Sequence, residues 1–270
     1  MELIRFLNKL ALGNTFSLKA CLESGNFMNS KEKFYPEAQF GGFTDIDGTM
    51  AFFNRVNSLL KPSFVILDVG CGRGSYAEDS VQIRRNLRII QGKVSKVIGI
   101  DVDQNAQHNP FLDEFHLIQG NSWPLDDNSI DLIICDNVLE HVCNPDTFFA
   151  EIYRVLKHNG LLCIRTPNRW SYIALAATVI PNKYHSKVTS IVQDGRKDED
   201  VFPTVYKCNS VKRLRRIMNK NGFEHVVYGY EAEPSYLSFS GVAYFLGVLH
   251  QKFAPGFLKP AIFAFGRIKK

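Results

Sequence analysis

Residues 64–74 read FVILDVGCGRG, an apolar run interrupted only by Asp68 and followed by alternating glycines. A short run of this kind, bounded by glycine, is typical of a strand buried within a parallel sheet. Gly70, Gly72 and Gly74 carry no Cβ atom, so the chain can adopt positive φ there and a ligand can press against the backbone. The segment therefore predicts a buried strand that ends in a glycine-rich binding loop.

Similar apolar runs recur along the chain, and helical or long crossover stretches separate them. The further predicted strands in this part of the chain cover residues 97–101, 115–118, 130–135 and 161–165. A long helical or partly helical stretch is expected over roughly 76–91. Another helix is expected after Asn144, an N-cap residue that precedes Pro145, and Gly160 is expected just beyond its end. This alternation favours a Rossmann-like, doubly wound α/β sheet, mostly parallel, with helices on both faces.

Regular patterning lapses after Pro167 and returns near the end of the chain. A helix is expected over residues 210–221, with Gly222 at its end, and a strand over 223–230. Residues 261–265 are expected to close the sheet as an antiparallel last strand. The chain therefore appends a second, less regular part to the alternating core.

We expect three parts along the chain. Residues 1–62 form an N-terminal helical extension, whose aromatic and glycine-rich stretch could fold over a cofactor as a lid. Residues 63–168 form the cofactor-binding core. Residues 169–270 hold the substrate-cap insertions plus the last helix and strands of the same domain.

The composition is that of an ordinary globular protein, with 45% hydrophobic and 22% charged residues among 270. The net charge of +5 is mild, so no nucleic-acid partner is expected. The six cysteines include no C-x-x-C pair, which argues against a metal site and for reduced, buried thiols in a cytoplasmic protein. No stretch reaches the ~18 uninterrupted apolar residues of a spanning helix.

Two cofactors compete for the glycine-rich loop. Dinucleotide folds use G-x-G-x-x-G, with the pyrophosphate at a helix N-terminus. Here Ser75 stands where the third glycine of that motif would be, and Gly74 precedes it, so the spacing is G-x-G-x-G. That form suits a cofactor without phosphates, and an NAD-dependent oxidoreductase is the alternative.

The residues DVGCGRG at 68–74 resemble the first motif of the class I S-adenosylmethionine (SAM) dependent methyltransferases, and IGID at 98–101 resembles the second. The resemblance implies that SAM is the cofactor and that its amino-acid end passes the glycines. It also implies that Asp101 accepts hydrogen bonds from the ribose hydroxyls, with Asp103 as the alternative. The contacts implied for these two motifs are Asp68, Gly70, Cys71, Gly72, Gly74, Asp101 and Val102.

The segment GNSWPL at 120–125 is similar to the part of the same family that holds the adenine. Asn121, Ser122 and Trp123 are the implied contacts. Family members often carry an acid where Asn121 stands, and the amide can still hydrogen-bond the adenine edge. Trp123 could stack beside the base or fill the core.

The segment SIDLIICDNVLEHV at 129–142 resembles the fourth-strand motif of the family. The resemblance implies that Asp136 and Asn137 lie near the reactive methyl group. His141 is the candidate general base, because a neutral imidazole titrates near the working pH. The other interpretation is that Glu140 and His141 brace the turn.

The methyl acceptor is the least defined part of the expected function. The chain resembles small methyltransferases of bacterial cell-surface polysaccharide pathways, so a small molecule or glycan is expected, with O-methylation of a sugar or lipid-linked glycan favoured. A quinone, aromatic or lipid acceptor is the alternative, and a non-catalytic module with the SAM fold also stays open. The aromatic and histidine residues that could line the acceptor cleft are Trp170, Tyr172, Tyr184, His185, Phe202, Tyr206, Tyr236 and Tyr244.

Residues 236–249 and 254–265 are apolar and lie close to the basic end of the chain. They could lie on a membrane surface, which would make the protein peripherally membrane-associated. The alternative is internal packing, with the second segment as the last strand of the sheet.

Overall fold

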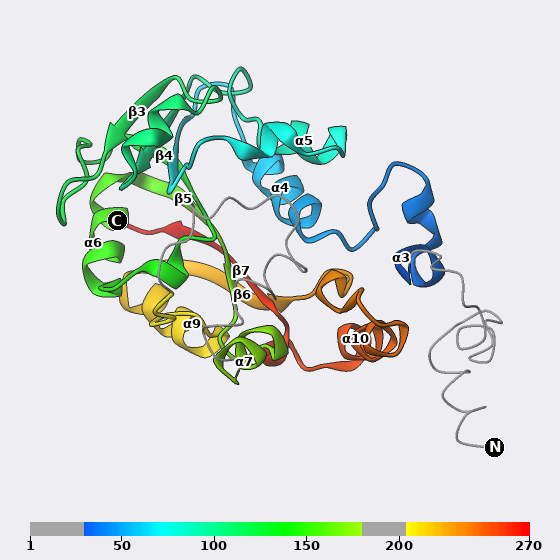
Figure 1. Cartoon of the computed structure of the whole chain (residues 1–270). Helices are drawn as coiled ribbons and strands as arrows, with labels where there is room; N and C mark the ends of the chain where they lie inside the picture. Colours follow the sequence, from blue (N-terminus) through cyan, green and yellow to red (C-terminus); the bar gives the residue numbers. More distant parts are fainter. Residues whose placement is uncertain (1–29, 180–203) are drawn as a thin grey trace, which may run out of the picture. The chain divides into compact units, whose positions relative to one another are not determined.

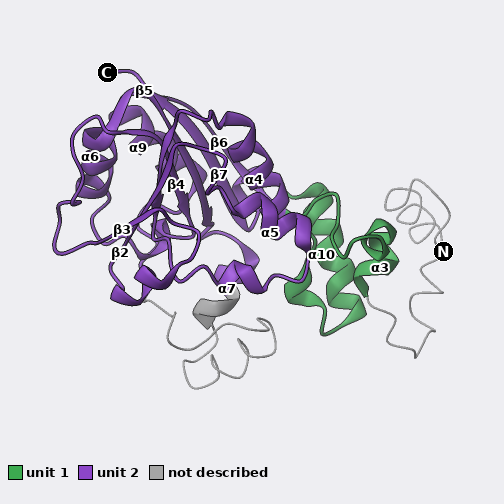
Figure 2. Ribbon diagram, turned by 90° about the horizontal axis from the view of Figure 1, so that it is seen from above, with its two compact units in different colours: residues 1–47, 231–254 green, residues 48–230, 255–270 purple. Residues whose placement is uncertain are grey.

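The computed structural model describes residues 30–179 and 204–270 (Figure 1). The chain forms two compact units, coloured separately in Figure 2. The larger unit holds the described strands and consists of residues 48–230 and 255–270. The smaller unit consists of residues 1–47 and 231–254. The expected boundaries at residues 62 and 168 stay predictions.

The larger unit contains one seven-stranded sheet in the order β3-β2-β1-β4-β5-β7-β6. The strands are β1 (Val65–Val69), β2 (Lys96–Asp101), β3 (Glu114–Leu117), β4 (Ile130–Asp136), β5 (Leu156–Pro167), β6 (Phe223–Tyr230) and β7 (Ala261–Ile268). Strands β1 to β5 are parallel, whereas β7 is antiparallel to both β5 and β6. The predicted fold class is therefore confirmed. The chain order reverses between β1 and β4, which is where such sheets bind their ligands.

Helices cover both faces of this sheet, as Figure 1 shows for the larger unit. Its described helices are α4 (Gly48–Leu59), η2 (Ser75–Glu78), α5 (Gln82–Arg88), η3 (Gln104–His108), η4 (Leu139–His141), α6 (Pro145–Val155), α7 (Tyr172–Val179), α9 (Val211–Lys220) and η7 (Gly256–Leu258). On one face, Leu67 belongs to a buried cluster with Phe149 of α6 and Leu214 of α9. On the other face, Ile66 belongs to a cluster with Phe52 of α4. Successive β1 residues thus face opposite layers, as the two-residue period of a strand requires.

The helix expected after Asn144 is confirmed at its start and wrong at its end. The Asn144 side chain accepts a hydrogen bond from the Thr147 amide (3.3 Å), and α6 begins at Pro145. The helix ends at Val155, because Leu156 already pairs with β4. Gly160 is therefore not a helix-terminating residue but lies inside β5.

The stretch expected to be helical or partly helical over roughly 76–91 is partly helical, with the two short helices η2 and α5. Asp79 separates them. Its carboxylate accepts a hydrogen bond from the Val81 amide (2.9 Å) and pairs with Arg84, so it terminates one helix and begins the next.

The smaller unit holds four described helices: α3 (Ser30–Phe34), η1 (Pro36–Gln39), η6 (Ser235–Leu237) and α10 (Gly241–Phe253). The rings of Phe34 and Tyr244 stack at 5.7 Å and join α3 to α10. The sequence had indicated only an irregular aromatic excursion where α10 forms. Among the described helices, none has the length and apolar character needed to cross a bilayer.

Candidate functional site

The glycine-rich loop leaves β1 at the carboxyl edge of the sheet. Gly70, Gly72 and Gly74 have φ values of +65°, +54° and +74°, so all three adopt the left-handed conformation. A Cβ atom at Gly70 would lie 2.6 Å from Cγ2 of Val138, whereas no atom lies within 4 Å of the corresponding position at Gly72. The loop therefore requires glycine for packing at one position and presents open backbone at the next.

Two side chains hold this loop in place. The Asp101 carboxylate, at the end of β2, accepts hydrogen bonds from the Gly72 amide (3.0 Å) and the Asp103 amide (2.9 Å). The buried Asn109 amide donates to the carbonyls of Cys71 (3.0 Å) and Gly72 (3.2 Å). Neighbouring β2 and the segment after η3 thus fix the conformation of the loop.

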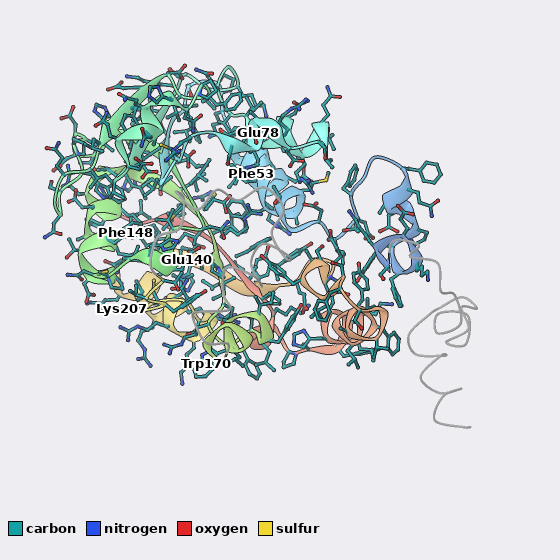
Figure 3. All side chains as sticks on the ribbon, in the orientation of Figure 1. Phe53, Glu78, Glu140, Phe148, Trp170 and Lys207 are labelled. Atoms are coloured by element: carbon teal, nitrogen blue, oxygen red, sulfur yellow. The ribbon has the colours of Figure 1, made fainter. Side chains whose placement is uncertain are left out.

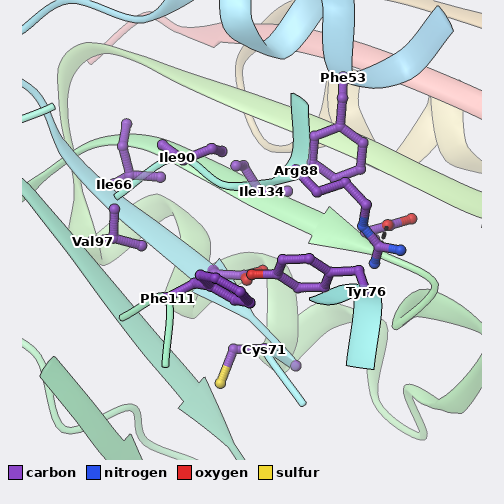
Figure 4. A pocket seen from close by; sticks show the side chains of 12 residues that line it. Phe53, Ile66, Cys71, Tyr76, Arg88, Ile90, Val97, Phe111 and Ile134 are labelled. Carbon is purple, nitrogen blue, oxygen red and sulfur yellow. Dashed lines mark ion pairs between the residues drawn. The ribbon is translucent and has the colours of Figure 1, made fainter. Parts of the chain in front are cut away.

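A pocket of about 530 Å³, open solvent at its mouth included, adjoins the loop (Figure 4). The residues that line it are Phe53, Ile66, Asp68, Gly70, Cys71, Tyr76, Arg88, Ile90, Val97, Phe111, Ile134 and Asp136. The structure therefore brings four of the predicted cofactor contacts, Asp68, Gly70, Cys71 and Asp136, to one pocket.

Asp136, at the end of β4, is held by two arginines. Arg165 of β5 donates to both of its carboxylate oxygens, from Nε at 2.6 Å and from Nη2 at 2.7 Å. The Arg88 guanidinium lies 3.8 Å away. Burial alone would raise the pKa of Asp136, but the two guanidinium groups lower that pKa below its usual range. Asp136 is therefore a paired carboxylate. Asn137, which follows it at a φ of +56°, donates to it from the side-chain amide at 3.1 Å.

Asp68 contrasts with Asp136 although both line the same pocket. No hydrogen bond to a described residue holds its carboxylate. Burial, followed by the charge of Asp136, raises the pKa of Asp68 to about 7, and the positive charge of Arg88 opposes that rise. The pocket thus contains a carboxyl group whose charge is incompletely compensated.

Glu140 and His141 follow β4 in the short helix η4. The Glu140 carboxylate is buried and accepts a hydrogen bond from the Thr166 hydroxyl (3.0 Å), and its backbone carbonyl accepts from the amides of Val205 and Tyr206. Burial raises the pKa of Glu140. Its place beside the core is marked in Figure 3. The His141 ring lies 3.9 Å from the Glu140 carboxylate and does not line the pocket. These contacts suit a brace for the turn, and the role of His141 as a base stays a prediction.

The predicted adenine contacts lie in two environments. Val102 is 60% exposed just beyond β2, and Asn121 and Ser122 are also exposed. Trp123 is buried in the core, and its ring meets that of Phe148 edge-on at 5.4 Å. Little of the indole therefore remains for a base to cover.

The acceptor residues expected from the sequence are only partly within the described chain. Tyr184, His185 and Phe202 lie outside the described residues. Tyr244 is fully buried in the smaller unit, whereas Trp170 is half exposed.

Sequence reasoning missed the other eight lining residues, among them Arg88, Tyr76 and Phe111. Arg88 lies among other arginines of α5 and carried no distinguishing signal. Tyr76 and Phe111 stack on each other at 5.0 Å, although they lie on separate segments of the chain. Only the folded structure brings these two rings together.

Comparisons with known proteins agree with this geometry. Residues 67–164 match the family model of a methyltransferase domain. A Mycolicibacterium smegmatis protein named "Probable S-adenosylmethionine-dependent methyltransferase" is 30% identical over 129 residues, which cover 45% of each chain. A mitochondrial ubiquinone biosynthesis O-methyltransferase of Bos taurus is 29% identical over 171 residues, 58% of this chain and 40% of its own. The chain thus spans less than half the length of these two curated relatives.

Among solved structures, a Thermotoga maritima protein described as a "SAM-dependent methyltransferase, possible histamine N-methyltransferase" superposes with a TM-score of 0.53. It is 18% identical and covers 90% of this chain and 96% of its own, so it supports the fold alone. The sequence matches of the core carry the identification further. Residues 67–164 therefore form a methyltransferase domain of the class I, SAM-dependent type, whose cofactor is SAM.

Proposed function

We propose that this protein transfers the methyl group of SAM to a small-molecule acceptor. The observation that carries the proposal is the glycine-rich loop held by Asp101 at the switch point between β1 and β4. Two features of the site support the fit of SAM. The backbone at Gly72 has no atom within 4 Å of a Cβ position, and the Asp68 carboxylate has no hydrogen-bond partner among the described residues. A ligand with an ammonium group complements the second feature.

SAM supplies an activated methyl group on a sulfonium. The residues of this chain would therefore act mainly by alignment, which can contribute ~7–11 kcal/mol to lowering a barrier. Asp101 would accept hydrogen bonds from the ribose hydroxyls, and Asp68 would attract the ammonium. Asp136 is neutralised by Arg165, so it is poorly suited to remove a proton from an acceptor. His141 is the candidate base if the acceptor is a hydroxyl.

For the acceptor, O-methylation of a sugar or a lipid-linked glycan is the favoured candidate. The half-exposed ring of Trp170 supports it, because an aromatic face suits a sugar ring. A quinone or other aromatic acceptor is the alternative, favoured by the similarity to the Bos taurus ubiquinone O-methyltransferase. Mass spectrometry after incubation with SAM and matched panels of hydroxylated sugars and catechols would separate the two. Methylation of the catechols alone would overturn the glycan proposal.

Peripheral membrane contact is proposed for the outer face of α10. Val242, Leu246 and Phe253 are each more than half exposed and lie within one 40° arc at the helical spacing of 100° per residue, and the exposed Phe239 precedes the helix. The helix carries no Asp or Glu, which suits an anionic lipid surface. Leu246→Glu should reduce co-sedimentation with phosphatidylglycerol vesicles, while Val226→Glu on exposed β6 should not. Equal binding of both variants to the vesicles would contradict membrane contact. So would a dimeric wild type that Leu246→Glu makes monomeric, because the exposed face would then be a protein interface.

The central proposal is tested by isothermal titration calorimetry with SAM, S-adenosylhomocysteine and NADH. We expect micromolar binding of the first two ligands and its loss in Asp101→Ala. Binding of NADH alone would favour an oxidoreductase instead. SAM binding without turnover on any acceptor would favour a non-catalytic module.

A further inference from the structure

Arg88 is the last residue of α5, and its side chain projects into the pocket (Figure 4). The guanidinium carbon lies 4.5 Å from the ring centre of Tyr76 and 5.6 Å from that of Phe53. Two aromatic faces therefore support this cation through cation–π contacts. The side chain is fixed in orientation before any ligand arrives.

The hydrogen-bonding capacity of Arg88 is incompletely used. Its Nε atom is buried and has no hydrogen-bond partner among the described residues, and its one ion pair with a described residue, to Asp136, is long at 3.8 Å. The neighbouring Arg84 and Arg85 are bonded instead to Asp79. The Arg88 guanidinium therefore keeps hydrogen-bonding capacity that an acceptor in the pocket could use.

Asp136 does not account for Arg88. The fork of Arg165 already occupies both oxygens of Asp136. A second guanidinium 3.8 Å away therefore supplies a positive charge that Asp136 does not need for pairing. On the same pocket wall, the Asp68 carboxyl is incompletely compensated. The Arg88 guanidinium and the Asp68 carboxyl share one pocket, and neither is closely paired. Together they complement a zwitterionic ligand.

We propose that Arg88 is the residue that binds the carboxylate of the amino-acid end of SAM, through its guanidinium group, while Asp68 faces the ammonium. This inference rests on the proposed function, because it places SAM in the pocket. A guanidinium and a carboxylate match in a planar, two-bond geometry, so Arg88 acts as a specificity-determining residue for the intact amino acid.

Calorimetry with paired ligands tests this assignment. SAM is compared with decarboxylated SAM, which keeps the ammonium and the sulfonium but lacks the carboxylate. The wild type should prefer SAM by about 10- to 100-fold, the difference expected for one charge-assisted pair. Arg88→Gln should lose most of that preference by weakening SAM and leaving decarboxylated SAM nearly unchanged. Arg88→Lys, which keeps the charge and loses the fork, should retain part of it.

Arg85→Gln is the matched control, because Arg85 lies on the same helix, bonds to the Asp79 carbonyl and does not line the pocket. It should bind both ligands as the wild type does. Equal weakening of both ligands in Arg88→Gln would show a structural role and overturn the assignment, as would an unchanged preference for SAM. A wild type that binds SAM but does not discriminate would overturn it too. A wild type that binds neither ligand would overturn the proposed function itself.

Discussion

Gly72→Ala separates the two properties that the glycine-rich loop combines, its backbone conformation and its open surface. The φ value of +54° places the new side chain in the left-handed region, which costs roughly 1–2 kcal/mol. No atom lies within 4 Å of the added Cβ, so no steric term is added in the free protein. We therefore expect the free energy of unfolding to fall by about 1–2 kcal/mol, or about 2–8 °C in Tm for a chain of this size.

The affinity for SAM should fall further than the stability does. The methyl group would occupy the open side of the loop, where the amino-acid end of the cofactor is proposed to lie. We expect the Kd for SAM to rise by at least ~10-fold, about 1.4 kcal/mol, by calorimetry on the folded variant. An unchanged Kd would refute the placement of the cofactor against this backbone.

Gly70→Ala is the matched comparison, because its added methyl group would clash with a neighbouring side chain in addition to having an unfavourable φ. Its Cβ would lie 2.6 Å from Val138 Cγ2, so overpacking of about 1–3 kcal/mol adds to the backbone cost. Urea denaturation should show a larger loss of stability than in Gly72→Ala, and Val138→Ala in the same chain should restore part of it. Equal stability of the two glycine variants would refute the steric account.

Three further predictions concern the carboxylates. The pKa of Asp68 is about 7 in the folded chain and about 3.9 when unfolded, so between these values the folded state binds one more proton than the unfolded state. The free energy of unfolding should therefore fall as the pH rises from about 4 to 7. Asp68→Asn should remove this contribution to the pH dependence, measured by urea denaturation at several pH values. Arg165→Met removes the two-bond partner of buried Asp136 and should lower the free energy of unfolding by about 3–5 kcal/mol, measured by urea denaturation at pH 7. Thr166→Val deletes a donor to buried Glu140 and should lower Tm by an amount equivalent to about 1–3 kcal/mol; an unchanged melt would contradict the bracing role.

The sheet and its binding loop were predictable from the sequence because local signals specify them. Each central strand is an apolar run that is buried on both faces. The three glycines mark the sharp turn at the end of β1. The helix ends were less predictable. Leu156 leaves α6 to pair with Ile130, and this tertiary pairing outweighs the glycine four residues later that had indicated a longer helix. The Asp79 carboxylate similarly sets where the helical part of residues 76–91 is interrupted, a position that the apolar pattern did not indicate.

The charged wall of the pocket could not be read from the sequence for a different reason. Arg88 and Asp136 come from distant parts of the chain, and nothing local distinguishes Arg88 from the solvated Arg85 beside it. What selects Arg88 is the convergence of Phe53 and Tyr76 on its guanidinium, which exists only once α4, η2 and α5 are in place. Sequence patterns thus locate the edge of the sheet that binds the ligand but not the side chains that discriminate among ligands.

Asp101 shows how one residue can serve both the fold and the site. Each carboxylate oxygen already accepts one backbone hydrogen bond, Oδ2 from Gly72 and Oδ1 from Asp103. A carboxylate offers about four lone-pair sites, so about one remains on each oxygen, enough for two adjacent hydroxyls. An amide at this position would turn a donor toward one of the two backbone N–H groups and lose both the loop contact and the acceptor pair. Asp101→Asn should therefore weaken SAM binding about as much as Asp101→Ala does, and an intermediate affinity in the calorimeter would show that charge, rather than the dual use of its oxygens, sets the requirement for aspartate.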